Sequence, residues 1–460
     1  MIDLNGYVNK NVPFKFKGVE LKFDLSHALF SSFDIDVGTR LLLKTTARDP
    51  VLASSRRILD EGCGVGVIGL CAAKAFPDAE VLLRDRDGLA VAFTERNRIA
   101  NKLRGVSAWT DPRTGAQRMA RPAPRVERGL LGDGREGGPF DFVFSNLPAK
   151  AGAPVLKRFF DSLSGKSGSP LLVGGGRAGV VIVNPLAEAA AEWIAEAGLS
   201  TVASERGSMH RVFVVERQGA EGRVEGSDEA TVDLPLAASY LGAYLRGEAR
   251  FKLADLAYRA SGYWGLPEFD TPGYGASIAA ELASRACKGG GFRDALFIEP
   301  GVGHLAIWAS RALGLKRVTA ASRDYLSLWA VDANLACLGE SSRPAYTAID
   351  ALGATDLPRD SFDLVVESPD IVPERDWIGP SWDLAGRLLR AGGFYLAYCS
   401  STEMTRLEKR RPEARHQDAS STRPPDGPTD GGEGGAVRWT LLGQRRKKAF
   451  VASVWRKRLA

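Results

Sequence analysis

Residues 58–69 constrain the fold of this chain more than any other stretch. Their sequence, Ile-Leu-Asp-Glu-Gly-Cys-Gly-Val-Gly-Val-Ile-Gly, is an apolar strand that ends in acids, then a glycine-rich turn and the start of a helix. Glycines let the backbone approach a ligand with no Cβ in the way, and the N-terminus of the following helix offers free N–H groups. The pattern therefore predicts a strand–turn–helix unit with a ligand at the turn.

The acid at position 60 distinguishes between classes of ligand. A carboxylate at Asp60 would repel a nucleotide phosphate, but it can hold the ammonium group and the positive sulfur of S-adenosylmethionine. A nicotinamide or flavin dinucleotide is the alternative, because residues 64–69 also fit G-x-G-x-x-G and Asp85 follows about twenty positions later. A turn without a ligand is the third interpretation. The sequence favours S-adenosylmethionine.

The length of 460 residues exceeds what one hydrophobic core usually supports, so two domains are expected. With 44% hydrophobic and 25% charged residues, the composition is that of a soluble globular protein. The sequence has no visible N-terminal signal and no apolar run that approaches a membrane span. We therefore expect a cytoplasmic protein.

The cysteines and histidines argue against a metal site or disulfides. The five cysteines are odd in number and widely spaced, there are only four histidines, and no paired Cys/His spacing occurs. We expect reduced thiols and no metal. Positive charge gathers at one place, because residues 437–460 hold eight Lys or Arg and no acid. That end is either a phosphate-binding surface or a solvated strand pair.

The two halves of the chain repeat each other in order. The strand and turn at 58–66 recur at 297–303, so that Glu299 falls where Asp60 does, and residues 81–87 recur at 318–324. Further along, Asn97 pairs with Asn334, and residues 140–148 pair with 362–369. Strands that alternate with helices indicate an open α/β sheet in each half, with ligands at the carboxyl ends of the strands.

Composition sets the expected domain boundaries. Residues 1–217 form the first domain, the polar stretch 218–231 is a linker, and residues 232–460 form the second domain. Two segments are predicted as mobile insertions: residues 106–138, rich in Arg and Pro, and residues 409–435, which are nearly free of apolar residues and predicted to be disordered.

The order of these motifs resembles one known group, the tandem small-domain class I methyltransferases that methylate the exocyclic N2 of guanine in bacterial rRNA. Leu-Ser-His-Ala-Leu-Phe-Ser at 25–31, Asp-Val-Gly at 36–38, the turn after Asp60 and Ser-Asn-Leu-Pro at 145–148 match that family in order and spacing. The resemblance implies an α/β fold of two tandem Rossmann-like class I methyltransferase domains. The second half resembles a degenerate copy of the first.

The resemblance also implies which residues hold S-adenosylmethionine. The methionine part would be surrounded by Asp60, Gly62, Gly64 and Gly66. Asp85, at the end of the second strand, would accept both ribose hydroxyls. Asp133 is the candidate for the acid near the adenine, with a solvated loop aspartate as the alternative.

The catalytic loop implied by the resemblance is Asn146, Leu147 and Pro148. In the family, the loop is Asn-Pro-Pro followed by an aromatic residue; the Asn oxygen and the next carbonyl accept the amine hydrogens, and the aromatic stacks on the extruded base. Here Leu147 replaces the first proline and Ala149 replaces the aromatic. Loss of stacking worth about 1–3 kcal/mol would slow the reaction roughly five- to 150-fold.

In the second half, Ser322 stands where Asp85 does, and Glu367-Ser368-Pro369-Asp370 replaces the catalytic loop. The first domain is therefore expected to bind the cofactor, and the second to shape an RNA surface. The predicted function is methylation of RNA, most of all rRNA guanine N2, as naked RNA or in a ribosomal particle. The alternatives are an inactive RNA-binding or ribosome-assembly protein and a protein-glutamine N-methyltransferase, since an Asn-Pro-Pro-Tyr loop serves that amide equally well.

Overall fold

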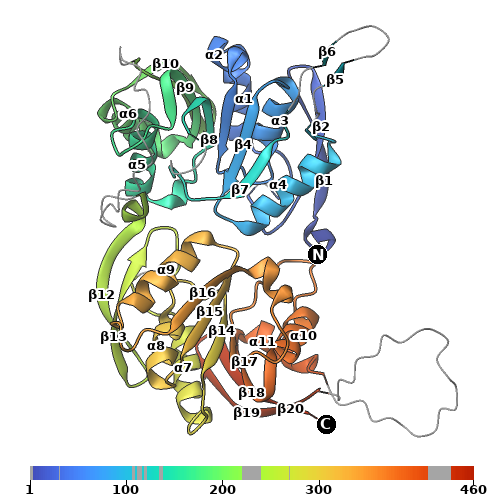
Figure 1. The fold of residues 1–460 in the computed structure, drawn as a ribbon, viewed down its shortest axis with the longest axis vertical. Coiled ribbons are helices and arrows are strands. Elements are labelled where there is room, and N and C mark those ends of the chain that lie inside the picture. Colours follow the sequence, from blue (N-terminus) through green and yellow to red (C-terminus); the bar gives the residue numbers. More distant parts are fainter. Residues whose placement is uncertain are drawn as a thin grey trace, which may run out of the picture. The chain divides into compact units, whose positions relative to one another are not determined.

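The structure is a computed structural model that describes residues 4–30, 32–105, 109–110, 117–118, 122–133, 138–219, 240–268, 270–412 and 437–459. These residues form two compact units (Figure 1). Unit 1 consists of Met1–Gly247, Tyr263–Gly265 and Arg323–Leu326, and unit 2 consists of Glu248–Gly262, Leu266–Ser322 and Ser327–Ala460. From position 220 onward the predicted linker lies outside the described residues, so the boundaries at 217 and 232 stay predictions.

Unit 1 begins with an antiparallel hairpin and continues with strands that alternate with helices (Figure 1). Its strands are β1 (Lys10–Phe16), β2 (Val19–Leu25), β3 (Arg57–Glu61), β4 (Glu80–Asp85), β5 (Trp109–Thr110), β6 (Gln117–Arg118), β7 (Arg125–Arg128), β8 (Phe140–Asn146), β9 (Leu172–Val183), β10 (Leu199–Arg206) and β11 (His210–Arg217). Its α-helices are α1 (Val37–Thr46), α2 (Pro50–Ser54), α3 (Val67–Ala75), α4 (Gly88–Ala100), α5 (Ala153–Ser164) and α6 (Ala187–Glu196).

Seven strands of unit 1 form one sheet in the order β10-β11-β9-β8-β3-β4-β7. The pairs from β7 to β9 are parallel, whereas β11 runs antiparallel to both β9 and β10. Strands of a parallel sheet are covered on both faces, which is why the central strands β3 and β8 are almost wholly buried. Ligands of such sheets bind at the carboxyl ends of the strands.

Unit 2 repeats this plan. Its strands are β12 (Leu245–Leu253), whose first residues belong to unit 1, β13 (Leu256–Tyr263), whose last residue belongs to unit 1, β14 (Asp294–Ile298), β15 (Arg317–Ser322), β16 (Ala345–Asp350), β17 (Phe362–Glu367), β18 (Leu389–Ser400), β19 (Val437–Lys447) and β20 (Phe450–Leu459). Its α-helices are α7 (Tyr274–Ala286), α8 (His304–Ala312), α9 (Tyr325–Ala336), whose first two residues belong to unit 1, α10 (Ile378–Leu388) and α11 (Ser401–Lys409).

The sheet of unit 2 has the order β16-β15-β14-β17-β18-β20-β19. Read from β7 to β10, the sheet of unit 1 has the same order, so that β7 corresponds to β16 and β10 to β19. Its four parallel pairs and its antiparallel end also fall at the same places. The predicted fold class, two tandem Rossmann-like α/β domains related by an internal repeat, is therefore confirmed.

A buried asparagine ties three elements together in each unit. Oδ1 of Asn97 accepts from the N–H of Asp24 at 2.8 Å, and its Nδ2 donates to the carbonyls of Asp24 and Val65 at 3.1 and 2.9 Å. Asn334 makes the same three bonds to Ser261 and Val302, at 2.7, 3.0 and 2.8 Å. Each side chain thus joins the helix after the second sheet strand to the hairpin and to the glycine turn.

A second shared contact explains the repeated Phe-Asp pair. Oδ2 of Asp141 accepts from the N–H groups of Arg56 and Arg57 at 2.8 and 2.9 Å, and so fixes the start of β3 beside β8. In unit 2, Asp363 accepts in the same way from the two residues at the start of β14, at 2.8 and 3.0 Å. These carboxylates are therefore structural.

The expected equivalence of Glu299 and Asp60 is wrong. The N–H of Glu299 donates to a carbonyl of the next strand at 2.8 Å, as the N–H of Gly62 does at 2.9 Å, and both residues have positive φ, 50° and 77°. Glu299 thus stands at the position of Gly62, and strand register puts Phe297 at the position of Asp60. In the first half, Asp60 and Glu61 both precede Gly62. Matching Glu299 to Asp60 because both are acidic therefore shifted the alignment of the two halves by two residues.

Part of the predicted insertion 106–138 belongs to the sheet, because β7 pairs with β4 as its edge strand. Positions 106–108, 111–116, 119–121 and 134–137 lie outside the described residues, as do positions 413–435 of the second predicted insertion, 409–435. No helix in the described part of the chain is long and apolar enough to cross a membrane. Within the same residues, no cluster of His, Cys, Asp or Glu is placed to hold a metal ion.

Asn97→Ala and Asn334→Ala test the shared role of the two asparagines. Each change leaves buried backbone groups of a hairpin and a turn without partners, at about 1–3 kcal/mol per group. We expect each to lower the free energy of unfolding by roughly 2–5 kcal/mol, measured by calorimetry. Arg104→Ala, at an exposed position after α4, is the control. Asn variants as stable as this control would contradict the assignment.

Candidate active site

The carboxyl ends of three neighbouring strands bring the predicted site residues of unit 1 to one edge of the sheet. In the register, Glu61 of β3 lies beside Arg84 of β4 and Ser145 of β8. Asp60 is therefore one residue before this level, and Asp85 and Asn146 are one residue beyond it. Since all three strands are parallel, the side chains that the sequence singled out lie around the glycine turn that follows β3.

The glycine turn is shaped to leave room on one side. Gly62, Gly64 and Gly66 have positive φ values of 77°, 58° and 86°, which favour glycine. A Cβ on Gly62 or Gly64 would meet no atom within 4 Å, whereas a Cβ on Gly66 would lie 2.9 Å from the side chain of Thr94 on α4. The first two glycines thus face open space, and Gly66 allows the turn to pack against a helix.

Asp60 is buried with one acceptor unused. Its Oδ2 accepts from the N–H of Gly69 on α3 at 2.7 Å. Its Oδ1 is buried and has no hydrogen-bond partner among the described residues. Burial raises the pKa of Asp60 to about 7. A buried carboxylate oxygen without a donor is costly, so this atom fits a site that a cationic or hydrogen-bonding ligand completes.

Asp85 closes the other side of the turn. Its Oδ2 accepts from the N–H of Gly64 and its Oδ1 from the N–H of Asp87, both at 2.9 Å. Burial raises its pKa to about 6. Each oxygen keeps a further lone pair, so both can still accept a hydroxyl group. Asp87 has a structural role, because its side chain caps α4 by accepting from the N–H of Leu89 at 2.9 Å.

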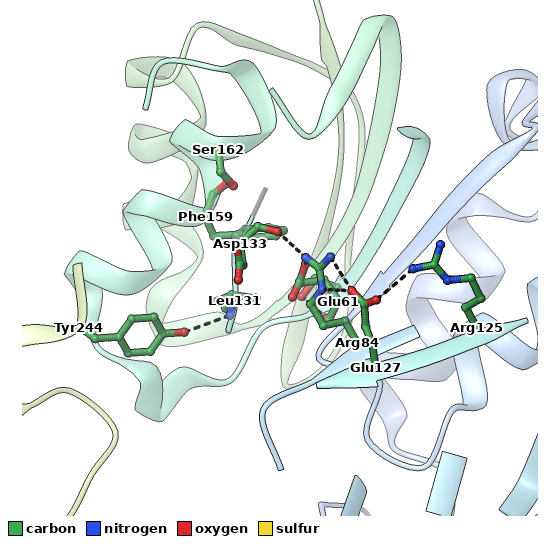
Figure 2. Close-up of polar contacts among 10 residues, drawn as sticks. Glu61, Arg84, Arg125, Glu127, Leu131, Asp133, Phe159, Ser162 and Tyr244 are labelled. Atoms are coloured by element: carbon green, nitrogen blue, oxygen red, sulfur yellow. Dashed lines mark hydrogen bonds and ion pairs between the residues drawn. The ribbon is translucent and has the colours of Figure 1, made fainter. Parts of the chain in front are cut away.

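Asp133 lies beside a buried ion-pair cluster (Figure 2). Its backbone carbonyl accepts from the guanidinium of Arg84, which is 2% exposed. The same guanidinium donates to Glu127 at 2.8 and 2.9 Å and lies 3.4 Å from Glu61. Burial alone would lower the pKa of Arg84, but the carboxylates of Glu61 and Glu127 raise it above its ordinary value. The role of Asp133 toward an adenine stays a prediction.

The cluster fixes the loop that follows β7. A Cβ on Gly129 would lie 2.4 Å from the side chain of Arg84, so only glycine lets the loop pass there. Further along, the N–H of Leu131 donates to the hydroxyl of Tyr244 at 3.1 Å (Figure 2). Tyr244 follows the predicted linker in sequence yet belongs to unit 1. Sequence reasoning missed Arg84 and Glu61, whose only signal was opposite charges inside apolar strands.

Asn146 is held by the loop before α1. Its Nδ2 donates to Oδ2 of Asp36 at 2.9 Å and to Oγ1 of Thr39 at 3.2 Å. The next residue, Leu147, is buried, and its N–H donates to the carbonyl of Val181 at 3.0 Å. Pro148 and Ala149 are exposed. Sequence reasoning gave Asp36 no role of its own, although Asp-Val-Gly was among the motifs.

The corresponding edge of unit 2 is built differently. The hydroxyl of Ser322 donates to Glu299 at 2.8 Å. The carboxylate of Glu367 is buried and accepts from the hydroxyls of Ser381, at 2.8 Å, and Tyr395. A Cβ on Gly301 would lie 3.6 Å from the side chain of Pro267, whereas a Cβ on Gly64 would meet no atom within 4 Å. Glu367 therefore does not face a ligand.

Comparison with known proteins places this site in a family context. The family Methyltransferase small domain matches residues 20–120. Ribosomal RNA small subunit methyltransferase C of Pseudomonas putida (strain W619) is 32% identical over 149 residues, 32% of this chain and 37% of that protein. Ribosomal RNA large subunit methyltransferase G of Streptomyces coelicolor is 32% identical over 141 residues, 29% of this chain and 32% of that protein. The chain thus spans about a third of the length of these curated relatives.

The fold comparison extends over the whole chain. The structure of a T. Thermophilus 16S rRNA N2 methyltransferase, in complex with AdoMet and guanosine, covers 98% of both chains with a TM-score of 0.59 and 16% identity. At this identity the likeness concerns the fold alone. The predicted resemblance to small-domain class I rRNA methyltransferases is therefore confirmed, by sequence in the N-terminal part of the chain and by fold over its length.

Proposed function

We propose that this protein is an S-adenosylmethionine-dependent methyltransferase that acts on RNA, with N2 of guanine in rRNA as the target, and that it works in the cytoplasm. One observation carries the proposal: an open glycine turn between the buried carboxylate of Asp60 and the half-buried carboxylate of Asp85 lies at the same sheet edge as Asn146. The similarity to rRNA methyltransferases supports the choice of substrate class.

The residues of the turn fit the cofactor. Oδ1 of Asp60 is a buried acceptor without a protein donor among the described residues, and it suits the ammonium end of a methionine. Gly62 and Gly64 leave space where a Cβ would stand, and the oxygens of Asp85 suit a pair of ribose hydroxyls. When bound, S-adenosylmethionine would supply a methyl group on a positive sulfur. As the methyl carbon bonded to the amine nitrogen, the sulfur would keep the electron pair of the carbon–sulfur bond, and the nitrogen would release one proton to water.

The protein's contribution to the chemistry is to hold the target amine. The lone pair of an exocyclic amine is delocalised into its ring, and oxygen atoms that accept its hydrogens return electron density to the nitrogen. Oδ1 of Asn146 and the carbonyl of Leu147 are the two acceptors that the loop offers. Their effect is positioning and polarisation, which are realised most strongly in the transition state.

A matched pair of substitutions tests the cofactor site. Asp85→Ala should weaken binding of S-adenosylmethionine to the full chain by about 1–3 kcal/mol, because two ribose hydroxyls lose their acceptor. Titration calorimetry measures the change. Ser322→Ala removes the corresponding side chain of unit 2 and should leave affinity and a stoichiometry of one unchanged. A folded Asp85→Ala protein with wild-type affinity would remove Asp85 from the site.

Asn146→Ala should abolish methyl transfer to RNA and leave cofactor affinity nearly intact, because Asn146 holds only the nucleophile. Transfer of a radiolabelled methyl group to bulk rRNA is the measurement. Ser368→Ala, at the corresponding loop of unit 2, is the control and should be as active as wild type.

Ala149→Phe supplies the reverse test of the same loop. Position 149 is exposed, so an aromatic can stack on an extruded base, and the rate should rise up to roughly 150-fold. A wild-type protein that methylates no RNA and gains nothing from Ala149→Phe would favour the inactive RNA-binding protein.

The turn between β19 and β20 is the proposed contact of unit 2 with RNA. Arg446, Lys447 and Lys448 are exposed there, and the ammonium groups of the two lysines lie 5.5 and 4.8 Å from the exposed ring of Tyr274. Basic side chains next to an aromatic suit a phosphate backbone with adjacent bases. Arg445 is instead paired with Glu281.

Changing Arg446, Lys447 and Lys448 to Gln should flatten the dependence of RNA affinity on salt. Each lost phosphate contact lowers the slope of log K against log salt by about 0.7–0.9, so a loss of roughly 2–3 is expected. Filter binding at several salt concentrations measures it. Arg410→Gln is the control, since Arg410 is paired with Asp376 at 2.7 and 2.8 Å. If the slope of log K against log salt stayed at the wild-type value, the turn would not contact RNA and would be only a solvated hairpin.

A further inference from the structure

One carboxylate on a distant loop fixes the side chain of Asn146. Oδ2 of Asp36 caps α1 by accepting from the N–H of Thr39 at 3.1 Å. The same oxygen accepts from Nδ2 of Asn146 at 2.9 Å, and Oγ1 of Thr39 lies 3.2 Å from that nitrogen. Asp36 and Asn146 are 110 positions apart, so folding alone brings them together.

The chemistry of Asp36 decides which way the amide faces. An ionised carboxylate only accepts hydrogen bonds, so the NH₂ group of Asn146 must face it and Oδ1 must point the other way. The reversed amide would place Oδ1 against a negative oxygen. Donation to a charged acceptor also polarises the amide, which makes Oδ1 a stronger acceptor for a substrate N–H.

Gly38 makes the close approach possible. A Cβ on this residue would lie 2.8 Å from Oδ2 of Asp36 and 3.1 Å from the ring of His210 at the start of β11. A larger residue would therefore displace either the carboxylate or the strand. The first and third residues of Asp-Val-Gly at 36–38 are thus explained by one contact.

We infer that Asp36, supported by Gly38 and Thr39, is a positioning residue that turns Oδ1 of Asn146 toward the target amine. The inference rests on the proposed function for the identity of that amine. The contact itself forms without substrate and can be measured separately. In this role Asp36 acts through Asn146 and contacts neither the cofactor nor the target nucleobase.

Selective ¹⁵N labelling of asparagine in the full chain tests the contact. The NH₂ signals of Asn146 are identified by their absence in Asn146→Ala. In Asp36→Ser they should move toward the values of free asparagine and exchange with water roughly ten-fold faster. Serine caps a helix as well as aspartate does, but it is too short to reach Asn146. Unmoved signals would overturn the inference.

Two further variants keep this test decisive. Asp49→Ser removes the aspartate that caps α2, at 2.9 and 3.1 Å from two N–H groups, and should leave the Asn146 signals in place. Gly38→Ala should move them, because its Cβ would push against Oδ2 of Asp36. If Asp36→Ser does not fold, Gly38→Ala alone decides, and unmoved signals again overturn the inference.

Methyl transfer then separates positioning from a structural role. Asp36→Ser should lower kcat roughly 10- to 100-fold without changing cofactor affinity or the KM for RNA. Asp36→Asn should keep most of the activity, because its Oδ1 still accepts from Asn146. Since serine and asparagine both cap α1, a difference in kcat between the two variants reports the contact with Asn146 and not the cap. Equal kcat for the two variants would overturn the positioning role. Moved signals in a protein that methylates no RNA would sustain the contact and reject the proposed function.

Discussion

The shape of the candidate site depends on the buried side chain and the backbone of Arg84. Its carbonyl accepts from the N–H groups of Gly62 and Cys63 at 2.9 and 3.0 Å, which holds the glycine turn. Its guanidinium holds the loop after β7 through Asp133 and Glu127. A buried charge is tolerated only when acceptors surround it, so the two carboxylates and the carbonyl are a consequence of placing Arg84 there. One residue therefore fixes two borders of the sheet edge.

The comparison of the two units separates structural contacts that both units have from positions at the candidate site where the units differ. Asn97 and Asn334 keep the same three hydrogen bonds, and the aspartates of the two Phe-Asp pairs keep theirs. At the ligand edge the units differ, since Phe297 occupies the position of Asp60. The contacts that the units share are those whose loss would leave buried backbone groups unpaired. Asp60 and Phe297 are both buried, so the two units fill the same position with a carboxylate in one and an apolar ring in the other.

Much of the fold could be predicted from the sequence because strand periodicity and glycine turns are local signals. The same signals placed Asp60, Asp85 and Asn146 at strand ends, and parallel pairing brought those ends together. Contacts between distant residues carried no such signal. Asp36 meets Asn146 across 110 positions, and the edge strand β7 lay hidden in a segment rich in Arg and Pro. The shifted match of Glu299 has a similar cause, because only strand register reveals which backbone group takes which place.

The structure also changes how the altered catalytic loop is understood. Proline would fix the backbone at position 147 but has no N–H. Leu147 instead donates its N–H to Val181 at 3.0 Å and buries its side chain, so the loop is held by a bond that proline could not make. A proline at position 147 would remove this hydrogen bond, and the bond already fixes the backbone that carries the carbonyl of Leu147. The exposed Ala149 has no such replacement within the loop. Under the proposed function, Ala149, which cannot stack on a base, is therefore a more consequential departure of this loop than Leu147.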